Sequence, residues 1–163
     1  MMKMVAPLEV GLCCGDLDAL VAFYVDVLNF AQVNVVEVPA EKAAGTMLCD
    51  CAYRVTRLQS PWGERVKLLQ PARPATVRPA SARILDERNT AYLTFIVADL
   101  QTMLGRLLER GVAVLTGPEM IEVRPGTFLV FARDPEGNIL EFVQYADVTA
   151  YRPELAAPGR AEA

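Results

Sequence analysis

The chain has 163 residues, 53% of them hydrophobic, which is enough to form one compact core. The net charge of −4 and a pI near 4.9 argue against a surface that binds nucleic acid. No apolar run reaches the roughly 18 residues of a membrane span, and the first residues lack the apolar core of a signal peptide. We therefore expect a cytoplasmic protein with neither a nucleic-acid nor a membrane partner.

The first half of the chain predicts a strand, a helix and three further strands. Alternation at residues 8–14 predicts a short strand. Asp16 is a good helix N-cap, an apolar stripe at helical spacing follows it, and Asn29 suits a left-handed stop. Three more strands are predicted at residues 30–38, 46–58 and 65–70, with a polar turn at residues 39–45.

The second half repeats this order. Residues 92–97 predict a strand, Asp99 a helix cap and Gly111 the end of the helix. Short strands are expected at residues 112–115 and 120–123, and residues 127–132 and 139–143 predict a hairpin around the turn at residues 134–138. Glu9 lies seven residues before Asp16, as Tyr92 does before Asp99, which indicates a duplicated half-domain.

The four cysteines are Cys13, Cys14, Cys49 and Cys51. All of them lie in apolar, strand-like runs, and neither a Cys-x-x-Cys pair nor a histidine accompanies them. Small buried hydrophobes in a reducing compartment explain them better than a zinc site does.

Three phrases, at residues 15–30, 97–100 and 131–142, resemble the vicinal oxygen chelate superfamily. The specific feature is the combination of Phe-Tyr-x-x-x-Leu, ending at Leu28, with the Asp-Pro-x-Gly-Asn turn that begins at Asp134. This superfamily includes glyoxalases, extradiol dioxygenases, methylmalonyl-CoA epimerase, fosfomycin-resistance enzymes and bleomycin-binding resistance proteins. The resemblance covers about residues 7 to 146.

The resemblance implies an α+β fold in which two βαβββ units pair their curled mixed sheets around a cup. We expect a single domain over residues 1–146, with units at about residues 7–71 and 90–146 and a linker at residues 72–89. Residues 147–163 are expected to form a loosely held tail. Family members commonly form dimers, and the sequence alone leaves a monomer and a homodimer open.

Metal-dependent members take one ligand from the first and last strands of each unit, usually His or Gln, Glu, His and Glu. The resemblance places these positions at Glu9, Lys67, Tyr92 and Glu141, of which only Glu141 matches, and the chain has no histidine. An ammonium offers no lone pair and a neutral phenol is a poor ligand, so we expect no metal and no cofactor at these positions.

These four residues are instead the candidate catalytic residues. Lys67 would lie between the carboxylates of Glu9 and Glu141 as a built-in cation. One carboxylate would abstract a proton while Tyr92 or Lys67 stabilises the developing anion, as in an isomerase, lyase or cyclase. A cluster that only satisfies buried charges explains the same residues equally well.

Two other functions stay open. A bleomycin-resistance-like protein would bind a drug or metabolite without chemistry, and the acidic chain would suit a cationic ligand. Only 7% of the chain is aromatic, and the candidate stacking groups are Tyr53, Trp62, Phe128 and Phe131. A metal-dependent glyoxalase-like or dioxygenase-like enzyme is the third alternative, with Cys13 as its one candidate soft donor. In each case the partner is a small molecule.

Overall fold

The computed structural model describes residues 3–79, 81 and 83–156. The chain forms two compact units, residues 1–78 and residues 79–163, and each contains its own mixed β-sheet. The predicted α+β fold with two units of strands and a helix is confirmed. No helix in the described part of the chain is both long and apolar enough to cross a membrane.

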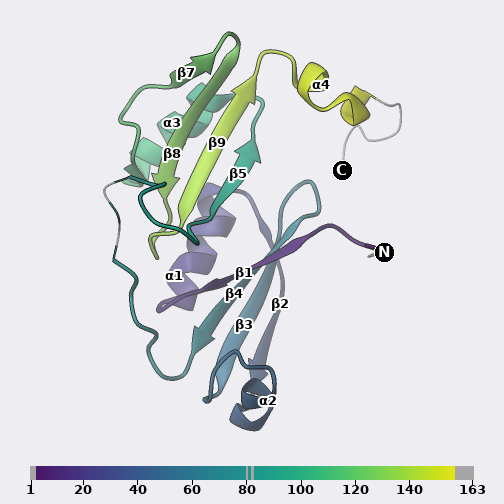
Figure 1. Cartoon of the computed structure of the whole chain (residues 1–163), viewed down its shortest axis with the longest axis vertical. Helices are drawn as coiled ribbons and strands as arrows, with labels where there is room; N and C mark the ends of the chain where they lie inside the picture. The colour runs from purple at the N-terminus through teal and green to yellow at the C-terminus, as the bar shows by residue number, and fades with distance from the viewer. Residues whose placement is uncertain (1–2, 80, 82, 157–163) are drawn as a thin grey trace. The chain divides into compact units, whose positions relative to one another are not determined.

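The first unit forms a four-stranded sheet (Figure 1). Its strands are β1 (Glu9–Cys13), β2 (Ala31–Val38), β3 (Tyr53–Gln59) and β4 (Arg65–Pro71). They lie in the order β1-β4-β3-β2, with β1 parallel to β4 and the other neighbours antiparallel. Glu9 pairs with Arg65, and Lys67 pairs with Arg57 on β3. Because side chains alternate between the faces of a sheet, these four residues share one face.

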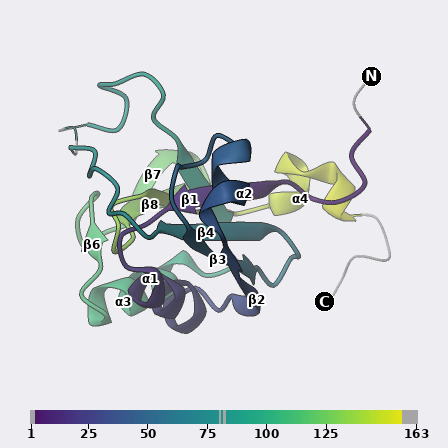
Figure 2. The same ribbon diagram turned by 90° about the horizontal axis from the view of Figure 1, so that it is seen from below.

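A helical segment lies on the other face of this sheet (Figure 2). α1 (Leu17–Ala22) begins at Asp16, whose carboxylate accepts the Ala19 N–H, and continues as one π-helical turn, η1 (Phe23–Val27). Asn29 has a φ of 60°, which confirms the predicted left-handed stop. The buried side chains of the helical segment and of the sheet form the core of the unit: Leu17, Leu20, Tyr24, Val27, Leu58, Val66 and Leu68.

A short helix, α2 (Ala40–Gly45), replaces the polar turn predicted at residues 39–45. Pro39 stands at its N-cap with extended backbone, and the residues after it, Ala-Glu-Lys-Ala-Ala, favour helix. The strand predicted from residue 46 begins only at Tyr53, because the chain between α2 and β3 follows turns and bends. The sequence pattern therefore placed the strand correctly but began it too early.

The second unit has a five-stranded sheet. Its strands are β5 (Tyr92–Ile96), β6 (Ala113–Val114), β7 (Ile121–Arg124), β8 (Thr127–Arg133) and β9 (Ile139–Tyr145). The order is β5-β9-β8-β6, with β7 also paired to β8 and β5 parallel to β9. α3 (Leu100–Glu109) lies behind β8 and β9 in Figure 1 and packs its buried leucines against them.

Asp99 starts α3 as predicted. Its carboxylate accepts the Thr102 N–H at 2.9 Å and the Thr102 hydroxyl at 2.6 Å. The hydroxyl contact is the main cause that holds the pKa of Asp99 below its usual value, followed by the backbone contact. Gly111 ends the helix with a φ of 67°. Equivalent caps therefore start the helix of each unit.

The turn between β8 and β9 is built around Asp134, one of the few buried polar residues. Its carboxylate accepts the backbone N–H groups of Glu136 and Asn138 and the side-chain amide of Asn138, at 2.8 to 3.0 Å. Gly137 has a φ of 86° and donates its N–H to the Asp134 carbonyl at 2.9 Å. The predicted hairpin is confirmed, with an aspartate as its organising residue.

Two short helices follow β9. They are α4 (Val148–Tyr151), capped by Asp147, and a 3-10 turn, η2 (Pro153–Ala156). The Tyr151 ring stacks on Tyr145 of β9 at 4.3 Å between centroids. The rest of the predicted tail, residues 157–163, lies outside the described residues. In the predicted linker, the described residues from 72 to 89 form neither helix nor strand.

Candidate functional sites on the two sheets

We call the face of each sheet that its helix does not cover the helix-free face. On the helix-free face of the first sheet, the Glu9 carboxylate has three cationic neighbours. It lies 3.9 Å from Arg57, 3.8 Å from Arg65 and 3.9 Å from Lys67. All four side chains are about one-third exposed. We refer to Arg57, Arg65 and Lys67 as the cationic cluster.

The hydrogen bonds of the cationic cluster go to neutral groups. Arg65 donates to the Gln59 side-chain oxygen at 2.9 Å, and Arg57 lies 3.5 Å from the Asn34 side-chain oxygen. Lys67 has only its ion pair with Glu9 among the described residues. The N–O distances of the Glu9 ion pairs are longer than the roughly 2.7 to 2.9 Å of a charge-assisted hydrogen bond, so each ion pair is weak. One carboxylate therefore leaves two positive charges uncompensated.

A cavity of about 190 Å³ opens beside this cluster. It is lined by Glu9, Gln59 and Arg65, by the residues just before β1 and by the turn after β3. Glu64, which precedes Arg65 in the chain, accepts a hydrogen bond from the Ser60 hydroxyl at 2.5 Å. The first unit thus combines a small cavity with an excess of positive charge.

The helix-free face of the second sheet has the opposite character. Glu141 lies between Thr94 and Phe131 in the strand register, and its carboxylate accepts the Thr94 hydroxyl at 2.5 Å. The Tyr92 ring meets Phe131 edge to face at 5.5 Å, across β9. A half-buried carboxylate is thereby placed beside an exposed phenol and an aromatic pair.

An aromatic stack with a cation lies at the end of the same sheet. The Arg124 guanidinium lies 5.8 Å from the centroids of both Tyr145 and Tyr151. Burial is the main cause that raises the pKa of the Tyr145 hydroxyl, followed by its hydrogen bond with Tyr151. The stack holds α4 against β9, which is a structural role.

The structure brings the predicted site residues together in pairs. Lys67 lies beside Glu9 in the first unit, and Tyr92 and Glu141 lie on one face in the second. That Lys67 also meets Glu141 stays a prediction. Sequence analysis missed Arg57, Arg65 and Thr94. Alternation places Arg65 and Thr94 beside their predicted neighbours, but only the strand register reveals Arg57.

The donor atoms do not fit the divalent metal site that the resemblance implies. Glu9 already faces three cations, which would repel a metal ion, and Lys67 adds an ammonium where a carboxylate is usual. The described residues contain no group of three or more His, Cys, Asp or Glu side chains that could hold a metal. The four cysteines are free thiols, of which Cys14 is buried and Cys13 is exposed.

The sequence matches the model of the Glyoxalase/Bleomycin resistance protein/Dioxygenase superfamily over residues 6–142. The chain belongs to this superfamily. The match spans both units and confirms the resemblance seen in the sequence. No curated protein matches at a significant level.

Solved structures of this superfamily share the fold. A glyoxalase family protein from Bacillus cereus is 19% identical, with a TM-score of 0.72 over 90% of this chain and 97% of its own. The trypanothione-dependent glyoxalase I of Leishmania major is 18% identical, with a TM-score of 0.63 over 91% and 92%. A glyoxylase/bleomycin resistance protein/dioxygenase domain from Frankia is 18% identical, with a TM-score of 0.63 over 88% and 93%. At these identities the likeness establishes the fold alone.

Proposed function

We propose that this superfamily member binds a small organic anion, a carboxylate or a phosphate ester, at its cationic cluster and without a divalent metal. The observation that carries the proposal is the environment of Glu9, where one carboxylate faces three cations at 3.8 to 3.9 Å. A second anion would satisfy the remaining charge and accept hydrogen bonds from Lys67 and Arg65. The adjacent cavity of about 190 Å³ is lined by Arg65 and would admit a compact ligand.

This local charge changes the expectation for a binding protein. The acidic composition favoured a cationic ligand, but an approaching molecule responds to nearby charges because distant ones are screened beyond about 10 Å. The cationic cluster therefore favours an anion despite the net charge of −4.

The test is binding of oxalate, inorganic phosphate and glycerol 3-phosphate, measured by calorimetry at low ionic strength. We expect Arg65→Gln and Lys67→Gln each to weaken binding about threefold to tenfold, because these side chains are partly exposed and screened. Glu9→Gln should strengthen binding, since it removes the carboxylate that competes with the ligand. Added salt should weaken binding in every variant.

Arg73→Gln is the matched control, because Arg73 pairs with Asp50 elsewhere in the first unit. An equal loss in Arg73→Gln and Arg65→Gln, or weaker binding in Glu9→Gln, would count against the proposed site. Unchanged unfolding temperatures would show that the variants keep their fold.

As a second candidate we propose proton transfer with Glu141 as the base, in an isomerase, lyase or cyclase. The supporting observation is the 2.5 Å hydrogen bond from the Thr94 hydroxyl, which orients the carboxylate on the helix-free face. The exposed Tyr92 hydroxyl would donate to the developing negative charge. Both groups belong to the second unit, so this candidate does not depend on the cationic cluster.

A further inference from the structure

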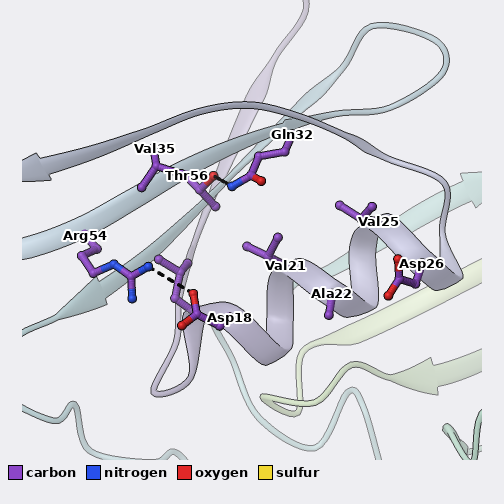
Figure 3. Close-up of a pocket in the computed structure, with 10 residues that line it drawn as sticks. Asp18, Val21, Ala22, Val25, Asp26, Gln32, Val35, Arg54 and Thr56 are labelled. Carbon is purple, nitrogen blue, oxygen red and sulfur yellow. Dashed lines mark hydrogen bonds and ion pairs between the residues drawn. The ribbon is translucent and has the colours of Figure 1, made fainter.

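A second cavity of the first unit lies on the helix-covered side of its sheet, away from the cationic cluster. Its volume is about 330 Å³, within the range of small-molecule sites. Figure 3 shows Val21 and Val25 of the helical segment directed toward the sheet, where Val35 and Thr56 face them. We call this cavity the helix-side cavity.

The hydrogen bonds inside the helix-side cavity determine the orientation of the Gln32 side-chain amide. The Thr56 hydroxyl donates its one proton to the Asn34 carbonyl at 2.7 Å. The Thr56 oxygen must therefore accept from Gln32, whose Nε2 lies 3.1 Å away. The Gln32 side-chain oxygen is left as an acceptor, and Figure 3 shows it turned away from Thr56.

The charged groups that line the helix-side cavity also provide hydrogen-bond acceptors. Arg54 is the only cation in its lining, and it is bound to Asp18 at 3.1 Å. The Asp26 side chain, near the end of the helical segment, forms no hydrogen bond or ion pair with another described residue. Two carboxylates and one guanidinium leave one negative charge. The lining thus offers acceptors and apolar walls, with its one cationic donor already paired.

We propose that the helix-side cavity binds a primary alkylammonium ion, with the ammonium at Asp26 and the hydrocarbon body on the valines. A positively charged ligand compensates the one excess negative charge of the lining at the Asp26 carboxylate. Val21, Val25 and Val35 cover the apolar part, and Val35 is 50% exposed without a ligand. An anion would meet two carboxylates and only a paired arginine, so the cavity rejects it.

This inference goes beyond the proposed function and is independent of it. The test uses n-alkylammonium ions from ethylammonium to hexylammonium, with n-hexanol as the neutral control, followed by amide chemical shifts in NMR. We expect the affinity to rise about threefold per methylene until the cavity is filled. Hexylammonium should bind more tightly than hexanol, and the shifts should map to α1, η1 and β2.

Asp26→Asn should weaken hexylammonium binding about threefold to fivefold, the size expected for an exposed ion pair, and leave hexanol binding unchanged. The matched control is Glu41→Gln on α2, which removes an exposed carboxylate outside the cavity. Equal binding of hexanol and hexylammonium, or equal effects of the two substitutions, would overturn the proposal. Arg65→Gln should not alter hexylammonium binding, which separates this site from the cationic cluster.

Discussion

At the scale of single residues, neighbours decide what each charged group can do. Glu9 and Glu141 were predicted as equivalent carboxylates, but they have different environments. Glu9 faces three cations and is surrounded by positive charge. Glu141 has the Thr94 hydroxyl as its hydrogen-bond donor, with aromatic rings beside it on the same face. Glu141 is therefore the better candidate base, because the Thr94 hydroxyl orients its carboxylate, whereas the Glu9 carboxylate is engaged by three cations.

The residue-scale prediction concerns this base. We expect the protein to accelerate hydrogen–deuterium exchange at the acidic carbons of small 2-oxoacids in D₂O, followed by proton NMR. Glu141→Gln should lower the catalysed rate at least about a hundredfold, since proton transfer by a positioned group contributes that much. Tyr92→Phe should lower it while leaving ligand affinity within about tenfold.

Glu119→Gln is the control, because Glu119 is an exposed carboxylate of the second unit that lies outside its strands. If the parent protein gives no exchange above buffer with any of these acids, proton transfer loses its support. Equal rates in Glu141→Gln and the parent would instead assign the exchange to another group.

At the scale of elements, a few short-range contacts position each strand and helix. At the β8–β9 turn, three hydrogen bonds converge on the buried Asp134 carboxylate. These bonds hold β9 in register with β8 and so place Glu141 opposite Phe131. A shift of one residue would turn Glu141 to the helix-covered face.

Asp134→Ala should lower the free energy of unfolding by about 2 kcal/mol, because it leaves partly buried N–H groups of the turn without their acceptor. Urea denaturation followed by circular dichroism measures this change. Glu119→Ala, an exposed substitution in the same unit, should change the stability by less than about 0.5 kcal/mol. A loss below about 1 kcal/mol in Asp134→Ala would mean that Gly137 and the strand pairing suffice to form the turn.

Local signals account for what the sequence could predict of these elements. Asp16 and Asp99 cap helices through contacts within three residues, and Asn29 and Gly111 end them, so all four could be found in advance. The cationic cluster depends on Arg57, which joins Lys67 only through the pairing of β3 with β4. The sequence alone does not give that register, and the helix-side cavity likewise requires the packing of α1 on the sheet.

At the scale of the whole molecule, the superfamily fold is combined with polar residues that differ from the usual metal ligands. The family resemblance places two of the four usual ligand positions in each unit. In the first unit these positions would be Glu9 and Lys67, which have two arginines beside them. This replacement leaves the strand pairing of the sheet intact. We therefore propose that these positions serve anion binding or proton transfer in place of divalent-metal catalysis.

The whole-molecule prediction is that the purified, untagged protein retains no stoichiometric metal. Plasma mass spectrometry after soaking in Zn, Ni, Fe, Mn or Mg and dialysis should find well below one ion per chain. The cationic cluster opposes binding, and one carboxylate with a phenol is a weak ligand set. One ion per chain that disappears in Glu141→Ala would contradict the metal-free proposal and favour a glyoxalase-like or dioxygenase-like enzyme.

The pairing of β1 with β4, and of β5 with β9, also has a consequence for the order of folding. In each unit the first strand lies beside the last, so a long loop must close before they can pair. During synthesis, the β2–β3 hairpin can form while β4 is still inside the ribosome. β1 can pair only after β4 has emerged. We expect β1 and β5 to join their sheets late, so that substitutions in them would speed unfolding more than they slow folding.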